Sequence, residues 1–70
     1  MSIIEAISKV LRWENAEYNV EFPNLKKYCE YQKCKISNFH NDLRQALMTM
    51  RAKQEIQDFC ISDSRISIFR

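Results

Sequence analysis

The spacing of the apolar residues changes along this chain, and the change points to a fold that combines helices with strands. Up to about residue 53 they recur every three or four positions, as on one face of a helix, except over residues 18–22. After residue 55 the β-favouring residues gather in two short runs. Because 70 residues can enclose only one small core, we expect residues 1–70 to form a single α+β domain.

Two helices are expected in the first half of the chain. The first begins with Ser2 and Glu5, which have the spacing of a capping box, and should extend to about Glu14. Asn24 can cap the second helix, which we expect to end in the polar stretch 32–35.

The third helix is expected to be the longest. Ser37 is its expected N-cap and Lys53 its approximate end, because helix-forming residues dominate the segment between them. Its core-facing side should consist of Phe39, Leu43, Ala46, Leu47 and Met50.

A β-hairpin is expected at the end of the sequence. Residues 56–61 and 65–69 are the two runs of β-favouring residues, and the polar residues 62–64 join them. The chain contains no glycine, so we expect a connection longer than a two-residue turn. The alternating residues 18–22 would add a third strand and cover one edge of the hairpin.

The aromatic side chains are expected mostly in the core, because they are dispersed and fall on apolar faces. Tyr31 is the exception and should be exposed near the end of the second helix. The aromatic residues assigned to the core are Trp13, Tyr18, Phe22, Tyr28, Phe39 and Phe59.

Composition argues against several classes of function. Without glycine, loops that cradle nucleotide phosphates are excluded. Cys29, Cys34, Cys60 and the single histidine, His40, have no spacing typical of a metal site or a catalytic thiol, so we expect no metal, no cofactor and no enzymatic activity. We expect reduced, buried or half-buried thiols in a cytoplasmic protein, because neither a membrane span nor a signal peptide is visible.

The net charge of +2 is small but unevenly distributed. Residues 1–22 carry a charge of −2, whereas residues 23–56 hold seven basic and three acidic residues, or +4. A central basic zone suits an anionic partner, with an ordinary solvated surface as the alternative that charge alone leaves open.

The predicted order of elements is that of a winged helix-turn-helix domain, with three helices and a C-terminal β-hairpin as the wing. In such domains the third helix lies in the major groove of DNA. Its outward face carries amides, which match adenine, and a guanidinium, which matches guanine; an ordinary polar surface is the alternative. The residues expected to read bases are Asn38, Asn41, Arg44 and Gln45. Those expected to contact the DNA backbone are Lys26, Lys27, Lys33, Lys35, Ser37 and Arg65.

From Leu25 onward, about two thirds of the chain resembles the C-terminal winged-helix domain of iteron-binding plasmid replication initiators, the Rep family. The resemblance rests on the segments 25–28 (LKKY) and 39–47 (FHNDLRQAL) and on the predicted hairpin. It implies that the base-reading residues named above contact DNA. Initiators of this kind have two winged-helix domains, bind repeated sites and can dimerise, so this chain would be an excised domain or a stand-alone regulator.

The sequence thus predicts sequence-specific binding of double-stranded DNA in replication initiation or transcriptional regulation, with no small-molecule substrate. The alternative is a winged helix that binds protein, or a small viral or plasmid-borne inhibitor with no affinity for DNA. An exposed patch of Tyr31, Met48 and Phe69 would favour the alternative. A homodimer through the apolar face of the first helix is compatible with both. That face consists of Ile3, Ile4, Ile7 and Leu11.

Overall fold

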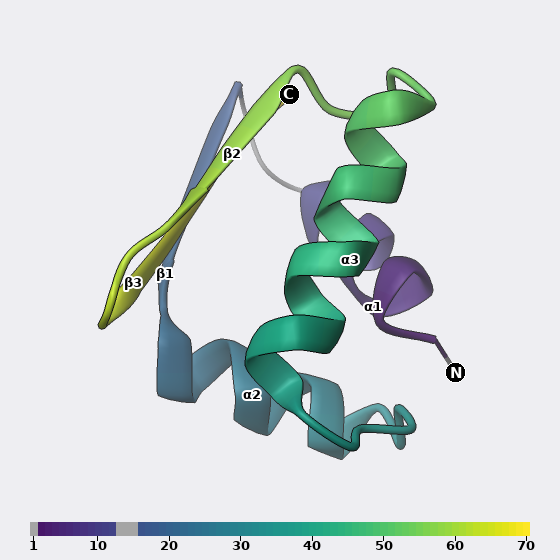
Figure 1. Cartoon of the computed structure of the whole chain (residues 1–70), viewed down its shortest axis with the longest axis vertical. Coiled ribbons are helices and arrows are strands. Elements are labelled where there is room, and N and C mark those ends of the chain that lie inside the picture. The colour runs from purple at the N-terminus through teal and green to yellow at the C-terminus, as the bar shows by residue number, and fades with distance from the viewer. Residues whose placement is uncertain (1, 13–15) are drawn as a thin grey trace.

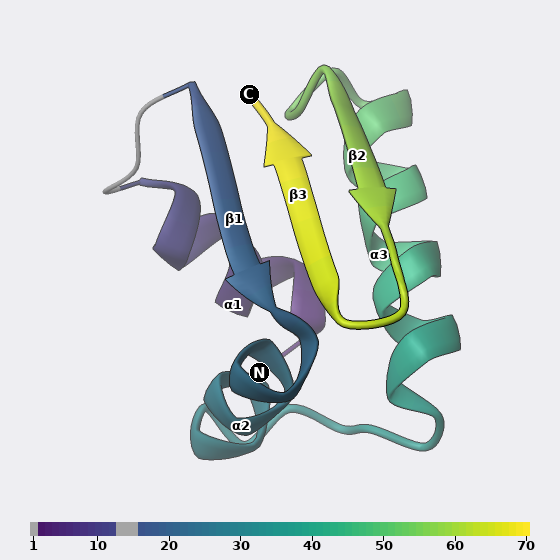
Figure 2. The ribbon, with the colours of Figure 1, turned by 90° about the vertical axis from the view of Figure 1, so that its left-hand side faces the viewer.

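Three helices and a three-stranded antiparallel sheet make up the fold, in the order that the sequence predicted. The computed structural model describes residues 2–12 and 16–70. The elements are α1 (Ile3–Leu11), β1 (Glu17–Glu21), α2 (Phe22–Tyr31), α3 (Phe39–Ala52), β2 (Asp58–Ile61) and β3 (Arg65–Phe69). The strand order is β1-β3-β2, so the predicted third strand does cover one edge of the hairpin. The helices gather on one face of the sheet, with α2 across one of its ends (Figure 1, Figure 2).

The start of α1 confirms the predicted capping box. The hydroxyl of Ser2 accepts the backbone N–H of Glu5 at 3.2 Å and donates to the Glu5 carboxylate at 3.3 Å. The helix ends at Leu11, earlier than the predicted end at Glu14. Residues 13–15, which include Trp13 and Glu14, lie outside the described residues.

Helix α2 begins earlier than the sequence predicted, and Asn24 is not its cap. Glu21 is the N-cap, and Pro23 stands in the first turn, where its missing N–H is not needed. The N–H of Phe22 donates to the carbonyl oxygen of Ser64 in the hairpin loop at 2.9 Å. This bond satisfies one orphan donor of the helix from a distant segment, so no capping side chain is required there. Phe22 therefore belongs to α2 and not to the preceding strand.

The start of α3 lies one residue beyond the predicted cap. Asn38 is the N-cap, and its side-chain oxygen accepts the N–H of Asn41 at 3.2 Å. The Asp42 carboxylate accepts the backbone N–H groups of Ser37 at 3.0 Å and of Asn38 at 3.2 Å. Asp42 thereby places a negative charge at the N-terminal end of the helix, where the helix dipole favours it.

Two helices end in a left-handed residue that is not glycine. After α3, Gln54 has a φ of 62°. Its N–H donates to Arg51 O at 3.0 Å, and the N–H of Glu55 donates to Met50 O at 2.9 Å, the two bonds of a Schellman motif. Lys33 has a φ of 60° after α2. In a chain without glycine, each of these ends places a residue with a Cβ atom in a region that costs about 1–2 kcal/mol.

The core lies between the helices and the inner face of the sheet. All five residues predicted for the inner side of α3 are buried, as are Ile66 and Ile68 of β3. Ile3, Ile7 and Leu11 of α1 are at most 7% exposed, which leaves only Ile4 partly exposed on the face considered for a homodimer. Phe39 is in this core, and the other described aromatic residues assigned to it pack at its edge. These are Tyr18, Phe22, Tyr28 and Phe59.

The hairpin closes through a three-residue loop, as expected without glycine. The Ser62 N–H and hydroxyl both donate to Arg65 O, at 2.8 and 2.9 Å, and the hydroxyl oxygen accepts the Arg65 N–H at 3.2 Å. Strand β2 begins at Asp58, two residues later than predicted, after Ile56 has entered the core.

The three cysteines are free thiols in three different environments. Cys29 is fully buried, and burial raises the pKa of its thiol to about 12, with the neighbouring Cys34 adding to the effect. Cys34 is half-buried. Cys60 is exposed, so the expectation of burial was wrong for this thiol, because the alternation of β2 turns it to the outer face of the sheet.

We expect replacement of Gln54 by glycine to stabilise the protein. The substitution Gln54→Gly should raise the free energy of unfolding by about 0.5–1 kcal/mol, because glycine removes the left-handed strain and loses part of that gain to its greater unfolded-state entropy. Urea denaturation measures the change. Gln54→Ala keeps the Cβ atom and should leave stability unchanged, so equal effects of the two substitutions would contradict this explanation.

The thiols should differ sharply in reactivity. In the native protein a water-soluble disulfide reagent should modify Cys60 first, whereas Cys29 should react only when the protein unfolds, because its thiolate is both inaccessible and disfavoured. Mass spectrometry of timed digests gives the order of modification. Cys60→Ser should remove the fast phase, and a fast phase that persists in this variant would show the assignment to be wrong.

Candidate nucleic-acid interface

The outward face of α3 carries the residues predicted to read bases, and all four are exposed: Asn38, Asn41, Arg44 and Gln45. With 3.6 residues per turn, Asn41, Gln45 and Met48 project away from the buried side of the helix. Arg44 borders the groove towards β2, whereas Gln45 borders a hollow towards α1. The four predicted residues therefore share the exposed side of α3, but their side chains point in different directions around the helix.

Asn38 is the least suited of the four to read a base. Its side-chain oxygen already accepts the N–H of Asn41 as the helix cap. A bidentate contact to adenine uses both the oxygen and the nitrogen of the amide, so Asn38 would have to give up the cap. Asn41 takes part in the α3 cap through its backbone N–H and not through its side-chain amide.

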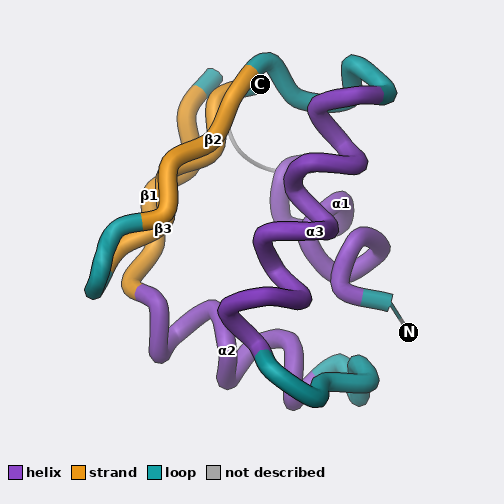
Figure 3. The backbone as a smooth tube through the Cα atoms, in the orientation of Figure 1, coloured by secondary structure: helices purple, strands orange, loops and turns teal. Residues whose placement is uncertain are grey.

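The lysines predicted to contact the DNA backbone are on α2 and in the connection that leads to α3. Lys26 and Lys27 are exposed on α2, and Lys33 and Lys35 are exposed in the connection between α2 and α3, as is Ser37. Figure 3 shows this connection as a loop that passes below the start of α3. Residues 22–52 together hold six basic and two acidic residues, which makes this half of the molecule cationic.

Arg65 does not join that group. It lies on the outer face of the sheet, opposite Glu21 of β1 in the strand register. The same outer face carries Glu17 and Asp58, which are opposite Phe69 on either side. The outer face of the sheet is thus mainly acidic, and an anionic ligand would meet α2 and α3 more favourably.

A groove of about 410 Å³ separates α3 from strand β2, and sequence reasoning missed two of its polar residues, His40 and Arg51. From the sequence, His40 is considered only as a metal ligand or as the partner of a catalytic thiol, and Arg51 is assigned no individual role. Their spacing from Arg44 is the signal that could have found them, because residues 40, 44 and 51 fall on one side of a helix. The residues that line the groove are His40, Arg44, Met48, Arg51, Phe59 and Ile61.

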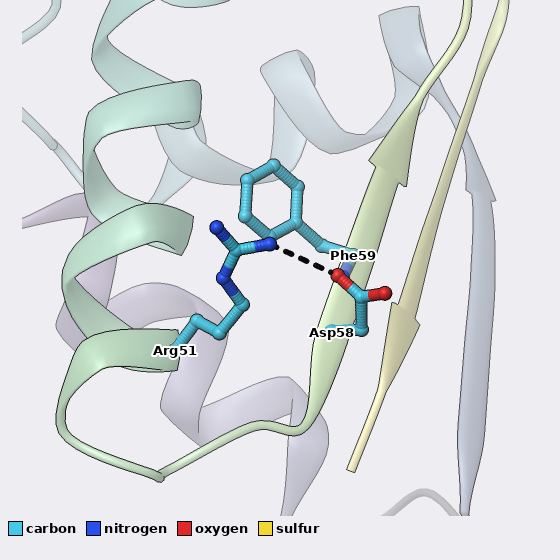
Figure 4. A network of polar contacts seen from close by, with 3 residues as sticks. All are labelled: Arg51, Asp58 and Phe59. Atoms are coloured by element: carbon cyan, nitrogen blue, oxygen red, sulfur yellow. Dashed lines mark hydrogen bonds and ion pairs between the residues drawn. The ribbon is translucent and has the colours of Figure 1, made fainter.

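Arg51 is held in this groove by two contacts (Figure 4). Its Nη1 donates to Asp58 Oδ1 at 3.2 Å, and its guanidinium lies 5.3 Å from the centre of the Phe59 ring. The Asp58 carboxylate also accepts the backbone N–H of Phe59 at 2.8 Å. This backbone bond, together with Arg51, keeps the pKa of the Asp58 carboxyl below its usual value.

The ion pair between Arg51 and Asp58 is an exposed one. The side chains are 49% and 62% exposed. Such a pair contributes about 0–1 kcal/mol in water, so it orients the arginine without locking it.

A second hollow, of about 560 Å³, lies between α1 and α3. Its apolar lining residues are Ile3, Ile4 and Ala46, and its charged lining residues are Glu5, Asp42 and Lys35. Two acidic groups against one lysine make this side of α3 less suited to an anion than the β2 side.

The apolar patch that would have favoured a protein partner does not form. Tyr31 is 82% exposed at the end of α2, and Met48 is 41% exposed in the groove beside β2. Phe69 is on the outer face of the sheet, since its neighbour Ile68 points into the core. The three residues are therefore on three separate surfaces.

Within residues 2–12 and 16–70, no group of three or more His, Cys, Asp or Glu side chains is arranged to hold a metal ion. In the same ranges, none of the helices has the length and apolar character needed to cross a membrane. Comparison of the chain with protein-family models, with curated proteins and with solved structures gives no match in any of the three.

Proposed function

We propose that this chain is a winged-helix domain that binds double-stranded DNA sequence-specifically through α3, in replication initiation or transcriptional regulation. The observation that carries the proposal is the outward face of α3, which combines exposed amide and guanidinium groups with cationic surroundings. The order of the elements and the pairing of β1 with β3 support the winged-helix assignment. The sequence resemblance to the initiator domains points the same way.

The proposed complex places α3 in the major groove. A helix with its side chains is about 10–12 Å wide, and the groove is about 12 Å wide, so the outward face would meet the base edges. Asn41 and Gln45 would address adenine, and Arg44 would address guanine. Asp42 is the only acidic residue of α3, and its carboxylate is occupied at the helix N-terminus. Repulsion from the DNA is therefore small on this face.

Phosphate contacts would come from the lysines of α2 and of its connection to α3. Lys26 and Lys27 on α2 and Lys33 and Lys35 in the connection would position the domain without reading sequence. Arg65 would contribute little, because Glu21 lies opposite it.

A protein partner is the second candidate function, and the hollow between α1 and α3 favours it. Its apolar lining of Ile3, Ile4 and Ala46 is the kind of surface that a partner side chain fills. The net charge of +2 is also modest for a DNA-binding protein. We place this function second because the exposed apolar residues are scattered and do not extend the hollow into a larger apolar surface.

The proposal predicts two distinct mutational signatures. Arg44→Ala should weaken binding to a selected cognate site by about 1–3 kcal/mol and change binding to random duplex much less, because it removes a base contact. Lys27→Ala should weaken binding to both DNAs alike and reduce the salt dependence, because it removes a phosphate contact. Fluorescence anisotropy at two salt concentrations measures both.

Lys9→Ala is the matched control, since Lys9 is exposed on α1 and should affect neither DNA. Equal losses for Arg44→Ala on cognate and random DNA would contradict base reading by Arg44. If the unmodified protein fails to bind random duplex even at low salt, DNA binding itself is wrong, and the search moves to a protein partner.

A further inference from the structure

We propose that the groove between α3 and β2 binds the sugar-phosphate backbone of one DNA strand, and that Asp58 competes with the phosphate for Arg51. The inference rests on the proposed function. It adds a backbone-contacting surface that lies outside the lysines of α2 and the connection, and it adds a residue of this chain that limits binding there.

A helix that fills the major groove has its two flanks against the two phosphate backbones. The helix and the groove have nearly the same width, so side chains at right angles to the outward face reach the groove walls. On α3 one flank faces β2 and the other faces α1. The charge of each flank therefore decides whether that flank can bind the phosphate backbone beside it.

The β2 flank is the one with the chemistry for phosphate. Arg44 and Arg51 are on it, together with the imidazole of His40. The opposite flank carries the acidic Glu5 and Asp42 against a single basic residue, Lys35. Arg51 is seven residues from Arg44, or about 10 Å along the helix, so Arg51 can contact a phosphate while Arg44 stays at the base edge.

Arg51 is oriented for such a contact before DNA arrives. The Phe59 ring supports the guanidinium at 5.3 Å, and a single nitrogen, Nη1, is bonded to Asp58. A guanidinium has five N–H donors, so donors remain for a phosphate oxygen. The ring contact can persist while the carboxylate is exchanged for phosphate.

Asp58 reduces the attraction in two ways. It accepts a hydrogen bond from Nη1 of the guanidinium, and its negative charge beside the groove repels a phosphate that approaches Arg51. Because its second bond, to the Phe59 N–H, fixes the carboxylate in place, the competition is built into strand β2. The substitution Asp58→Asn removes the charge and keeps an oxygen that can accept this N–H.

Two substitutions with opposite effects test the proposal on random-sequence duplex DNA. Arg51→Gln should weaken binding about three- to tenfold and lower the slope of log affinity against log salt by about one. Asp58→Asn should strengthen binding about two- to fivefold at 0.1 M salt, because it frees Arg51. Both factors should be the same on a cognate site, since neither residue is proposed to read bases.

Matched controls separate a local effect from a change in total charge. Arg12→Gln removes an arginine charge at the end of α1 and should leave binding unchanged. Glu17→Gln removes an acidic charge from the same outer row of the sheet as Asp58, two strands or about 10 Å away, and should also leave it unchanged. Circular dichroism verifies the fold of each variant, which the exposure of these side chains should preserve.

Each result bears on one of the two proposals. If Arg51→Gln binds like the unmodified protein, or Asp58→Asn binds no better than Glu17→Gln, the groove does not hold the backbone and the inference is wrong. Weakening by Lys27→Ala on the same duplex, or by Arg44→Ala on a cognate site, would then leave the proposed function standing. Absence of binding by the unmodified protein would overturn both.

Discussion

The burial of one side of α3 determines the orientation of everything else on that helix. Leu43, Leu47 and Met50 are at most 1% exposed, and truncation of such a side chain in a core costs about 2–5 kcal/mol. A rotation that exposed this stripe would therefore be prohibitive. Since a helix has a fixed angular period, the same burial holds Asn41 and Gln45 towards solvent. The candidate interface is thus a consequence of the core and needs no separate stabilisation.

Contacts at the N-terminal end of α3 connect this helix to α2 and, through α2, to the hairpin. The rings of Phe22 and Phe39 meet edge to face with centroids 5.2 Å apart, which joins the start of α2 to the start of α3. The Phe22 N–H then bonds Ser64 O in the hairpin loop. Because these two contacts share one residue, α2, α3 and the hairpin are held together at this end. The cationic residues on α2 consequently have a defined position relative to α3.

The sequence predicted those features that depend on local spacing. The inner stripe of α3 and the capping box at Ser2 follow from periodicity or short-range hydrogen bonding, as does the extended conformation of the strand that pairs with the hairpin. Boundaries failed where a tertiary contact decided them: the bond from Phe22 to the hairpin loop moved the start of α2. The phase of β2, which exposes Cys60, depends on its register with β3. The Arg51–Asp58–Phe59 contact was out of reach because it joins a helix to a strand across an intervening turn, and no residue pattern encodes that approach.

Arg44 lies where the two parts of the proposed interface meet. It borders the groove together with Arg51, yet it is adjacent in sequence to Gln45, which faces the other way. A phosphate in the groove would attract both guanidinium groups, and an Arg44 drawn to the backbone could not read guanine. Arg51, supported by Phe59, can satisfy that phosphate and leave Arg44 to the base edge. Asp58 would then lower the affinity for cognate and random DNA alike, because it weakens a contact to the DNA backbone while Arg44 stays at the base edge.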